Sequence, residues 1–73
     1  MSLARALAAN LRARRGDRTQ EVFARRLGVS RATLTRLESG GQNTTIKTLE
    51  QISRALHCQI GELFESPQTP GRS

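Results

Sequence analysis

The chain has 73 residues, which is enough for one domain and too few for a second. It contains no Trp or Tyr and only two Phe, so it lacks the aromatic platform on which proteins stack single-stranded nucleic acids. The net charge is +6, and all of this excess lies in residues 1–43, where nine arginines accompany three acidic residues. Such an imbalance favours a polyanionic partner, although a charged face that only confers solubility is the alternative explanation.

The apolar pattern at the start of the chain and the single cysteine indicate in which cellular compartment the protein lies. No apolar run approaches the roughly 18 residues that span a membrane, and Arg5 and Asn10 interrupt the stretch where a signal peptide would be apolar. Cys58 has no second cysteine with which to form an internal disulfide, which fits a reducing compartment. We therefore expect a cytoplasmic protein without membrane contact.

The spacing of apolar residues predicts an all-α chain of five short helices. The first helix has one apolar stripe, made by Leu3, Leu7 and Leu11. Gly16 ends this helix, and Thr19 can cap a second helix that Gly28 ends. No run of alternating β-branched residues exists, so we do not expect a sheet.

The second half of the chain continues the helical pattern. Ser30 can cap a third helix, and Thr44 or Thr45 opens a fourth. The apolar stripe of the fourth helix consists of Ile46, Leu49, Ile52 and Leu56. A last short apolar helix contains Ile60, Leu63 and Phe64. Residues 66–73 hold two prolines and a glycine without periodicity, so we predict a domain over residues 1–65 and a flexible tail over 66–73.

Residues 20–37 predict a helix-turn-helix. Two short helices joined by about three residues must cross steeply, which requires a small residue such as Ala24 at the crossing and a glycine such as Gly28 at the corner. Val29, Leu34 and Leu37 then face the core. The residues left facing outward on the second of the two helices are Arg31, Ala32, Thr33, Thr35 and Arg36.

This outward face has the chemistry that reads DNA. Arginine can pair with guanine through two hydrogen bonds, and threonine can bond a base edge or touch the methyl group of thymine. The alternative is an ordinary helical hairpin whose arginine and threonine face is merely solvated. The basic excess in the same part of the chain favours DNA binding.

From Leu7 to Phe64 the chain resembles the phage repressor/Cro family, the Xre-type regulators of bacteria. The resemblance depends on Thr19-Gln20-Glu21, Leu27-Gly28-Val29-Ser30, Leu37-Glu38-Ser39-Gly40, Asn43-Thr44-Thr45-Ile46 and Glu62-Leu63-Phe64. It implies a five-helix repressor/Cro-like domain, encoded by a bacterium or phage. It also implies that the recognition helix, about Ser30–Ser39, enters the major groove of double-stranded DNA.

The resemblance further implies roles for single residues. Base-reading residues would be Arg31, Ala32, Thr33 and Arg36. Phosphate-binding residues would be Gln20, Ser30, Thr35, Asn43, Thr44 and Thr45. Glu38 would pair with an arginine late in the first helix, for which Arg14 and Arg15 both qualify. A homodimer would form through the last helix, with Ile60, Leu63 and Phe64 as interface residues.

The expected function is that of a transcriptional regulator, specifically a repressor that binds a pseudo-palindromic operator as a homodimer. An antitoxin-like or restriction-modification controller module, which also binds a toxin or another protein, is the alternative. The short proline-rich tail leaves little chain for such a partner. A helical interaction domain that does not touch DNA is a third possibility, which the basic first half opposes.

His57 and Cys58 are neighbours and raise the question of catalysis or metal binding. The sequence has no other His or Cys, so they offer a metal two adjacent ligands at most. A catalytic pair would need separated side chains and a third orienting group. We expect packing at a helix end for both residues, and neither catalytic residues, metal nor cofactor. His57 also departs from the family pattern, in which a glycine commonly ends the fourth helix.

Overall fold

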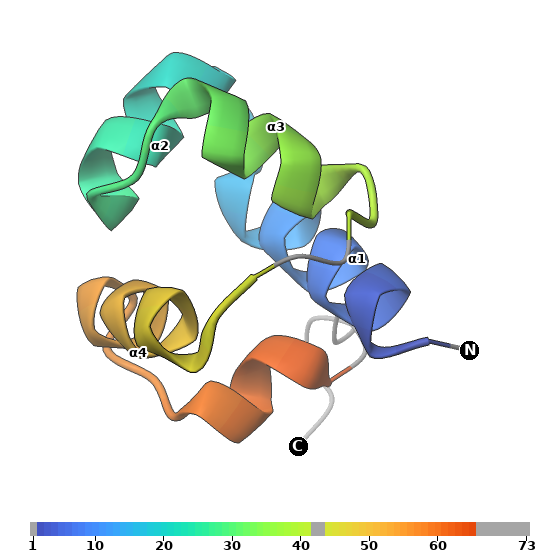
Figure 1. The fold of residues 1–73 in the computed structure, drawn as a ribbon. Coiled ribbons are helices and arrows are strands. Elements are labelled where there is room, and N and C mark those ends of the chain that lie inside the picture. Colours follow the sequence, from blue (N-terminus) through green and yellow to red (C-terminus); the bar gives the residue numbers. More distant parts are fainter. Residues whose placement is uncertain (1, 42–43, 66–73) are drawn as a thin grey trace, which may run out of the picture.

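The computed structural model describes residues 2–41 and 44–65, which form four α-helices and one short 3-10 helix (Figure 1). Along the chain these are α1 (Leu3–Arg15), α2 (Gln20–Leu27), α3 (Arg31–Glu38), α4 (Ile46–Ala55) and η1 (Ile60–Phe64). The described residues contain no strand, so the all-α prediction is confirmed. Asn43 and the predicted tail, residues 66–73, lie outside the described residues.

The last element differs from the sequence prediction. A fifth helix was expected, and η1 is a five-residue 3-10 helix instead of an α-helix. Five residues make fewer than two turns of a 3-10 helix, and Gly61 within them is a poor helix former. The segment begins with a local bond in which the Glu62 carboxylate accepts from the backbone N–H of Gln59 at 2.9 Å. The short turn is thus fixed by capping and by packing, not by helix propensity.

Hydroxyl side chains begin the α-helices where the sequence predicted them. Thr19 Oγ1 accepts from the backbone N–H of Val22 at 3.1 Å at the start of α2. Thr45 does the same for Thr48 at 3.1 Å, which identifies Thr45 and not Thr44 as the N-cap of α4. Each cap satisfies one of the N–H groups that the first turn of a helix leaves without a partner.

The turn between α2 and α3 is held in place by α4. Gly28 has φ +78°, a left-handed conformation that suits glycine. Gln51, on α4, donates from its side-chain amide to the carbonyls of Leu27 and Gly28. A Cβ on Gly28 would lie 2.5 Å from that same Gln51 amide nitrogen, so it would push this flexible side chain away from the turn, while the left-handed backbone itself favours glycine.

The elements form a closed ring of contacts around one core. In this ring α1 packs on α3, α3 on α2, α2 on α4, α4 on η1, and η1 on α1. The buried core residues are Leu7, Leu11, Phe23, Ala24, Leu27, Leu34, Leu37, Leu49, Ile52 and Leu63. Two members of the predicted stripes, Leu3 and Ile46, are instead 70% and 65% exposed, because the first turns of α1 and α4 project beyond the core. No helix in the described ranges is both long and apolar enough to cross a membrane.

Candidate nucleic-acid interface

α3 presents one polar face to solvent and buries the opposite one. Leu34 and Leu37 are 0% and 3% exposed and lie in the core. The exposed residues of α3 include Arg31, Ala32 and Arg36, three of the four predicted base-reading residues. The structure therefore leaves these three side chains free of the core on one helix, as a reader of base edges requires.

The fourth predicted base reader, Thr33, takes part in the N-cap of its own helix. Ser30 Oγ accepts from the backbone N–H of Thr33 at 3.0 Å and donates its proton to Thr33 Oγ1 at 2.9 Å. The predicted phosphate ligand Ser30 and the predicted base reader Thr33 thus bind each other within the protein, and Thr33 is half-buried.

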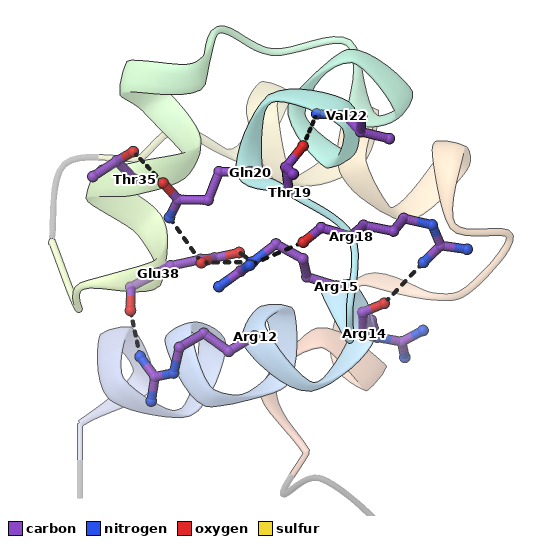
Figure 2. A network of polar contacts seen from close by, with 9 residues as sticks. All are labelled: Arg12, Arg14, Arg15, Arg18, Thr19, Gln20, Val22, Thr35 and Glu38. Atoms are coloured by element: carbon purple, nitrogen blue, oxygen red, sulfur yellow. Dashed lines mark hydrogen bonds and ion pairs between the residues drawn. The ribbon is translucent and has the colours of Figure 1, made fainter.

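A buried ion pair joins the end of α1 to the end of α3. Glu38 is 4% exposed, and its two carboxylate oxygens accept from Arg15 Nε at 2.9 and 3.1 Å (Figure 2). The pairing partner left open by the sequence is therefore Arg15. Arg14 instead donates to Asn10 Oδ1 at 2.7 Å. Asn10 in turn donates 2.9 Å bonds to the carbonyls of Glu62 and Glu65, which holds the segment after α4 against α1.

Gln20, the first residue of α2, extends this pair to the middle of α3. Its Nε2 donates to Glu38 Oε1 at 3.0 Å, and its Oε1 accepts from the Thr35 hydroxyl at 3.1 Å (Figure 2). Both residues were predicted to bind phosphate, and the structure places them against each other. The sequence pattern did not reveal this contact, since the partners are 15 residues apart on different helices.

Several arginines near the end of α1 hold the fold together. Arg12 donates from Nη1 to the backbone carbonyl of Glu38, and Arg15 Nη1 donates to the carbonyl of Arg18 at 3.0 Å. Arg18 reaches back to the carbonyl of Arg14 at 3.4 Å. These bonds fasten α1 to α3 and to the link before α2 (Figure 2).

The segment after α3 lies against Arg36, one of the predicted base-reading residues. The backbone N–H of Gly41 donates to the carbonyl of Arg36 at 2.8 Å. A Cβ on Gly41 would lie 2.5 Å from Cγ of Arg36. Further along, Thr45 is exposed at the start of α4, whereas Thr44 is half-buried and its Oγ1 has no hydrogen-bond partner among the described residues. Of Thr44 and Thr45, the two predicted phosphate ligands at this end that the structure describes, only Thr45 is exposed to solvent.

The predicted dimer residues of η1 divide into two groups. Leu63 is 0% exposed and belongs to the core of the single chain, so it has no surface to offer a partner. The expectation for Leu63 is corrected on this ground. Ile60 and Phe64 are only partly buried against the core. Phe64 lines a groove together with Leu3 and Leu7 of α1.

His57 and Cys58 lie at the end of α4. His57 is exposed with φ +57°, and Cys58 is a partly buried free thiol. Burial raises the pKa of Cys58 above its ordinary value, Arg14 lowers it by less, and Glu62 raises it further. No group of three or more potential metal ligands occurs in residues 2–41 and 44–65.

Two short helices joined by a glycine turn, the second with a buried apolar face and an exposed arginine face, define a helix-turn-helix domain. The family described as helix-turn-helix matches residues 9–63, and the chain belongs to this Xre-type family of DNA-binding transcriptional regulators.

Two curated relatives carry regulatory names. The plasmid copy control protein CopR of Streptococcus agalactiae is 45% identical over 51 residues, which cover 70% of this chain and 55% of CopR. An uncharacterized HTH-type transcriptional regulator of Archaeoglobus fulgidus is 39% identical over 46 residues, which cover 63% of this chain and 65% of that protein. The chain thus spans between about half and two thirds of these relatives. No solved structure matches significantly.

Proposed function

We propose that the protein is a sequence-specific repressor of transcription that binds double-stranded DNA through α3. The observation that carries this proposal is the exposed face of α3, on which Arg31, Ala32 and Arg36 lie clear of the core. Inserted into the major groove, the two arginines would each donate paired hydrogen bonds to a guanine, and the Ala32 methyl would fit against a thymine methyl. Those contacts would set the sequence preference.

Backbone contacts to DNA would come from the starts of the helices. An N-terminus of a helix presents free N–H groups and partial positive charge, which suits a phosphate oxygen. The starts of α2, α3 and α4 follow Thr19, Ser30 and Thr45, all exposed in the structure. The arginine excess of residues 1–43 would add affinity that falls as salt rises, because bound arginines release the counterions of the phosphates.

We further propose that two copies bind a pseudo-palindromic site. Leu3, Leu7 and Phe64 line a groove of about 400 Å³, and the described residues around it include no charged side chain. In a chain of net charge +6, an uncharged apolar surface is where a second copy approaches with the least repulsion. A two-fold axis would place the recognition helices roughly 34 Å apart, in successive major grooves.

The names of the relatives agree with a regulatory role. One is a plasmid copy control protein and the other an HTH-type transcriptional regulator. Neither name mentions a toxin or a restriction-modification system, and the antitoxin-like alternative gains no support from them. Repression is the simplest use of a domain that occupies DNA, since it requires only that polymerase be excluded.

Selection of bound sequences from a random DNA pool tests this function. The full chain should enrich one sequence with dyad symmetry, and Arg31→Ala and Arg36→Ala should each relax the preference at one position per half-site. Arg54→Ala, which removes an exposed arginine at the far end of α4, is the matched control. Enrichment of no sequence would contradict specific binding, and a site without symmetry would contradict the homodimer.

A further inference from the structure

We propose that Gly41 is a positioning residue for Arg36. Because position 41 bears no side chain, the aliphatic stem of Arg36 keeps one conformation, and from it the guanidinium reads a base. This inference rests on the proposed DNA binding, in which Arg36 is one of the base-reading residues. It adds to the recognition helix a specificity-determining residue that lies beyond the end of α3, where the chain turns (Figure 1).

The end of α3 fixes the backbone of Arg36. The N–H of Gly41 donates to the carbonyl of Arg36 at 2.8 Å. The N–H of Gly40 donates to the carbonyl of Leu37 at 3.3 Å, and these two bonds form a Schellman motif. The hydroxyl of Ser39 also donates to the Arg36 carbonyl, at 3.0 Å. One carbonyl thus accepts from two residues of the segment after α3, which fixes this segment against Arg36.

The side chain of Arg36 occupies the space beside Gly41. A Cβ on Gly41 would lie 2.5 Å from Cγ of Arg36, 2.8 Å from its carbonyl oxygen and 3.4 Å from its carbonyl carbon. These three nearest atoms all belong to Arg36, and none of them is the flexible far end of the side chain. Any residue other than glycine at position 41 would therefore displace either the stem or the backbone of Arg36.

The backbone conformation of Gly41 does not itself call for glycine. Among the described glycines, φ is positive at Gly16, Gly28 and Gly40 but not at Gly41. Without a positive φ, the backbone has no steric reason to exclude a side chain. The contact with Arg36 is therefore what requires glycine at position 41.

A stem that is already held in place favours base reading. Arginine has many rotamers, and ordering such a side chain on binding costs free energy. The contact with Gly41 restricts where Cγ of Arg36 can lie, so part of this ordering is complete before DNA binds. Hydrogen bonds to a base edge require both distance and angle to be correct, so a displaced Cγ would misplace the guanidinium donors. Gly41 should therefore affect the base position that Arg36 reads and no other.

Substitution of Gly41 in the full chain tests the proposal. Affinities for sites with each base varied in turn identify the position read by Arg36, as the one that Arg36→Ala relaxes. In Gly41→Ala, the preference at this position should fall about three- to tenfold, the cost of ordering one long side chain. The preference at the position read by Arg31 should be retained. In the Arg36→Ala background, Gly41→Ala should lower the preference no further.

Gly40→Ala is the matched control, because it strains the same turn without touching Arg36. Gly40 has φ +85°, and a Cβ there would meet no atom within 4 Å. This variant should lose stability and keep the base preference. Equal relaxation in Gly40→Ala and Gly41→Ala would overturn the proposal, and so would an unchanged preference in Gly41→Ala. A loss spread evenly over all positions would overturn it too, since Gly41 also lines the groove proposed for the second copy.

A measurement on the free, unmodified protein separates this inference from the proposed function. Three-bond NMR couplings report χ1, the angle that places Cγ, and Arg36 should show a single rotamer. Arg54, an exposed arginine in the last turn of α4, should show an average over rotamers. Averaged couplings for Arg36 would overturn the proposal, even where Gly41→Ala fails to fold. A single rotamer together with no DNA selection would contradict the proposed function, while the contact itself stands.

Discussion

Arg15 and Glu38 form an ion pair in which one guanidinium nitrogen, Nε, lies 2.9 and 3.1 Å from the two oxygens of the carboxylate. The pair is asymmetric in burial, since Glu38 is 4% exposed and the side chain of Arg15 is 26% exposed. A buried carboxylate is tolerated only with a counter-charge and hydrogen bonds. Gln20 supplies a further donor, so the end of α1, the start of α2 and the end of α3 meet at one charge.

Glu38→Ala should be strongly destabilising. It would leave the Arg15 guanidinium without its counter-charge and the Gln20 amide without its acceptor. Breaking a buried pair in this way costs about 3–5 kcal/mol, and the partial exposure of Arg15 places the expected loss near about 3 kcal/mol. Urea unfolding followed by circular dichroism measures it.

Glu21→Ala is the matched control for that loss. Glu21 and Arg25 form a 3.5 Å pair on α2, with side chains 70% and 74% exposed. Such exposed pairs contribute about 0.3–0.5 kcal/mol to the free energy of unfolding, so Glu21→Ala should lose no more than this. Equal losses in Glu38→Ala and Glu21→Ala would show that burial of Glu38 adds nothing, contrary to our account of the pair.

Arg36→Ala should weaken binding to the selected DNA site by about 1–3 kcal/mol, chiefly at one base position. The physical reason is the loss of a paired donor to a guanine. Fluorescence anisotropy against sites with each base varied in turn measures the effect, and Arg54→Ala corrects for the loss of one positive charge. A uniform weakening on all sequences would mean that Arg36 contacts phosphate instead of a base.

Local chemistry made much of the fold predictable. Helix starts depend on a hydroxyl residue and the N–H group three residues on, so Thr19 and Ser30 could be recognised in the sequence. The corner glycine, Gly28, follows from the same local logic because its left-handed backbone is a property of one residue. The division of α3 into a buried and an exposed face followed from helical periodicity.

Contacts between distant residues could not be predicted in the same way. The choice of Arg15 over Arg14 depends on how α1 rotates against α3, which adjacent arginines do not reveal. The Gln20–Thr35 bond depends on the crossing of α2 and α3. Leu63 was expected at an interface because the family resemblance implies a dimer through the last helix, whereas the packing of η1 on α1 and α4 buries it. These are properties of tertiary packing.

Cys58 should react slowly with iodoacetamide in the folded protein. Burial raises its pKa, with Glu62 adding to and Arg14 opposing the shift, so less of the reactive thiolate is present at a given pH. The raised pKa also adds stability that is complete below the pKa of the unfolded thiol and is lost as the pH rises through the higher pKa of the folded one. Alkylation rates in buffer and in urea test this, and equal rates would contradict it. In Cys58→Ser this loss of stability at alkaline pH should disappear.

His57→Gly should stabilise the protein. The end of α4 has the hydrogen bonds of a Schellman motif, with the N–H of Cys58 on the carbonyl of Ser53 at 2.9 Å and the N–H of His57 on that of Arg54 at 3.2 Å. α2 ends with the same two bonds, and there the left-handed position is occupied by Gly28. His57, with φ +57°, bears a Cβ where this motif favours glycine.

Glycine relieves that strain, but its greater freedom in the unfolded chain offsets part of the gain. The net increase in the free energy of unfolding should be about 0.5–1 kcal/mol. The shift of the urea midpoint at constant slope measures the gain. His57→Ala is the control, because alanine keeps the Cβ and should not stabilise the fold. A gain of equal size in His57→Ala would mean that the imidazole, and not the left-handed backbone, carries the cost. Since His57 lies at the opposite end of α4 from Thr45, DNA binding by His57→Gly should be unchanged.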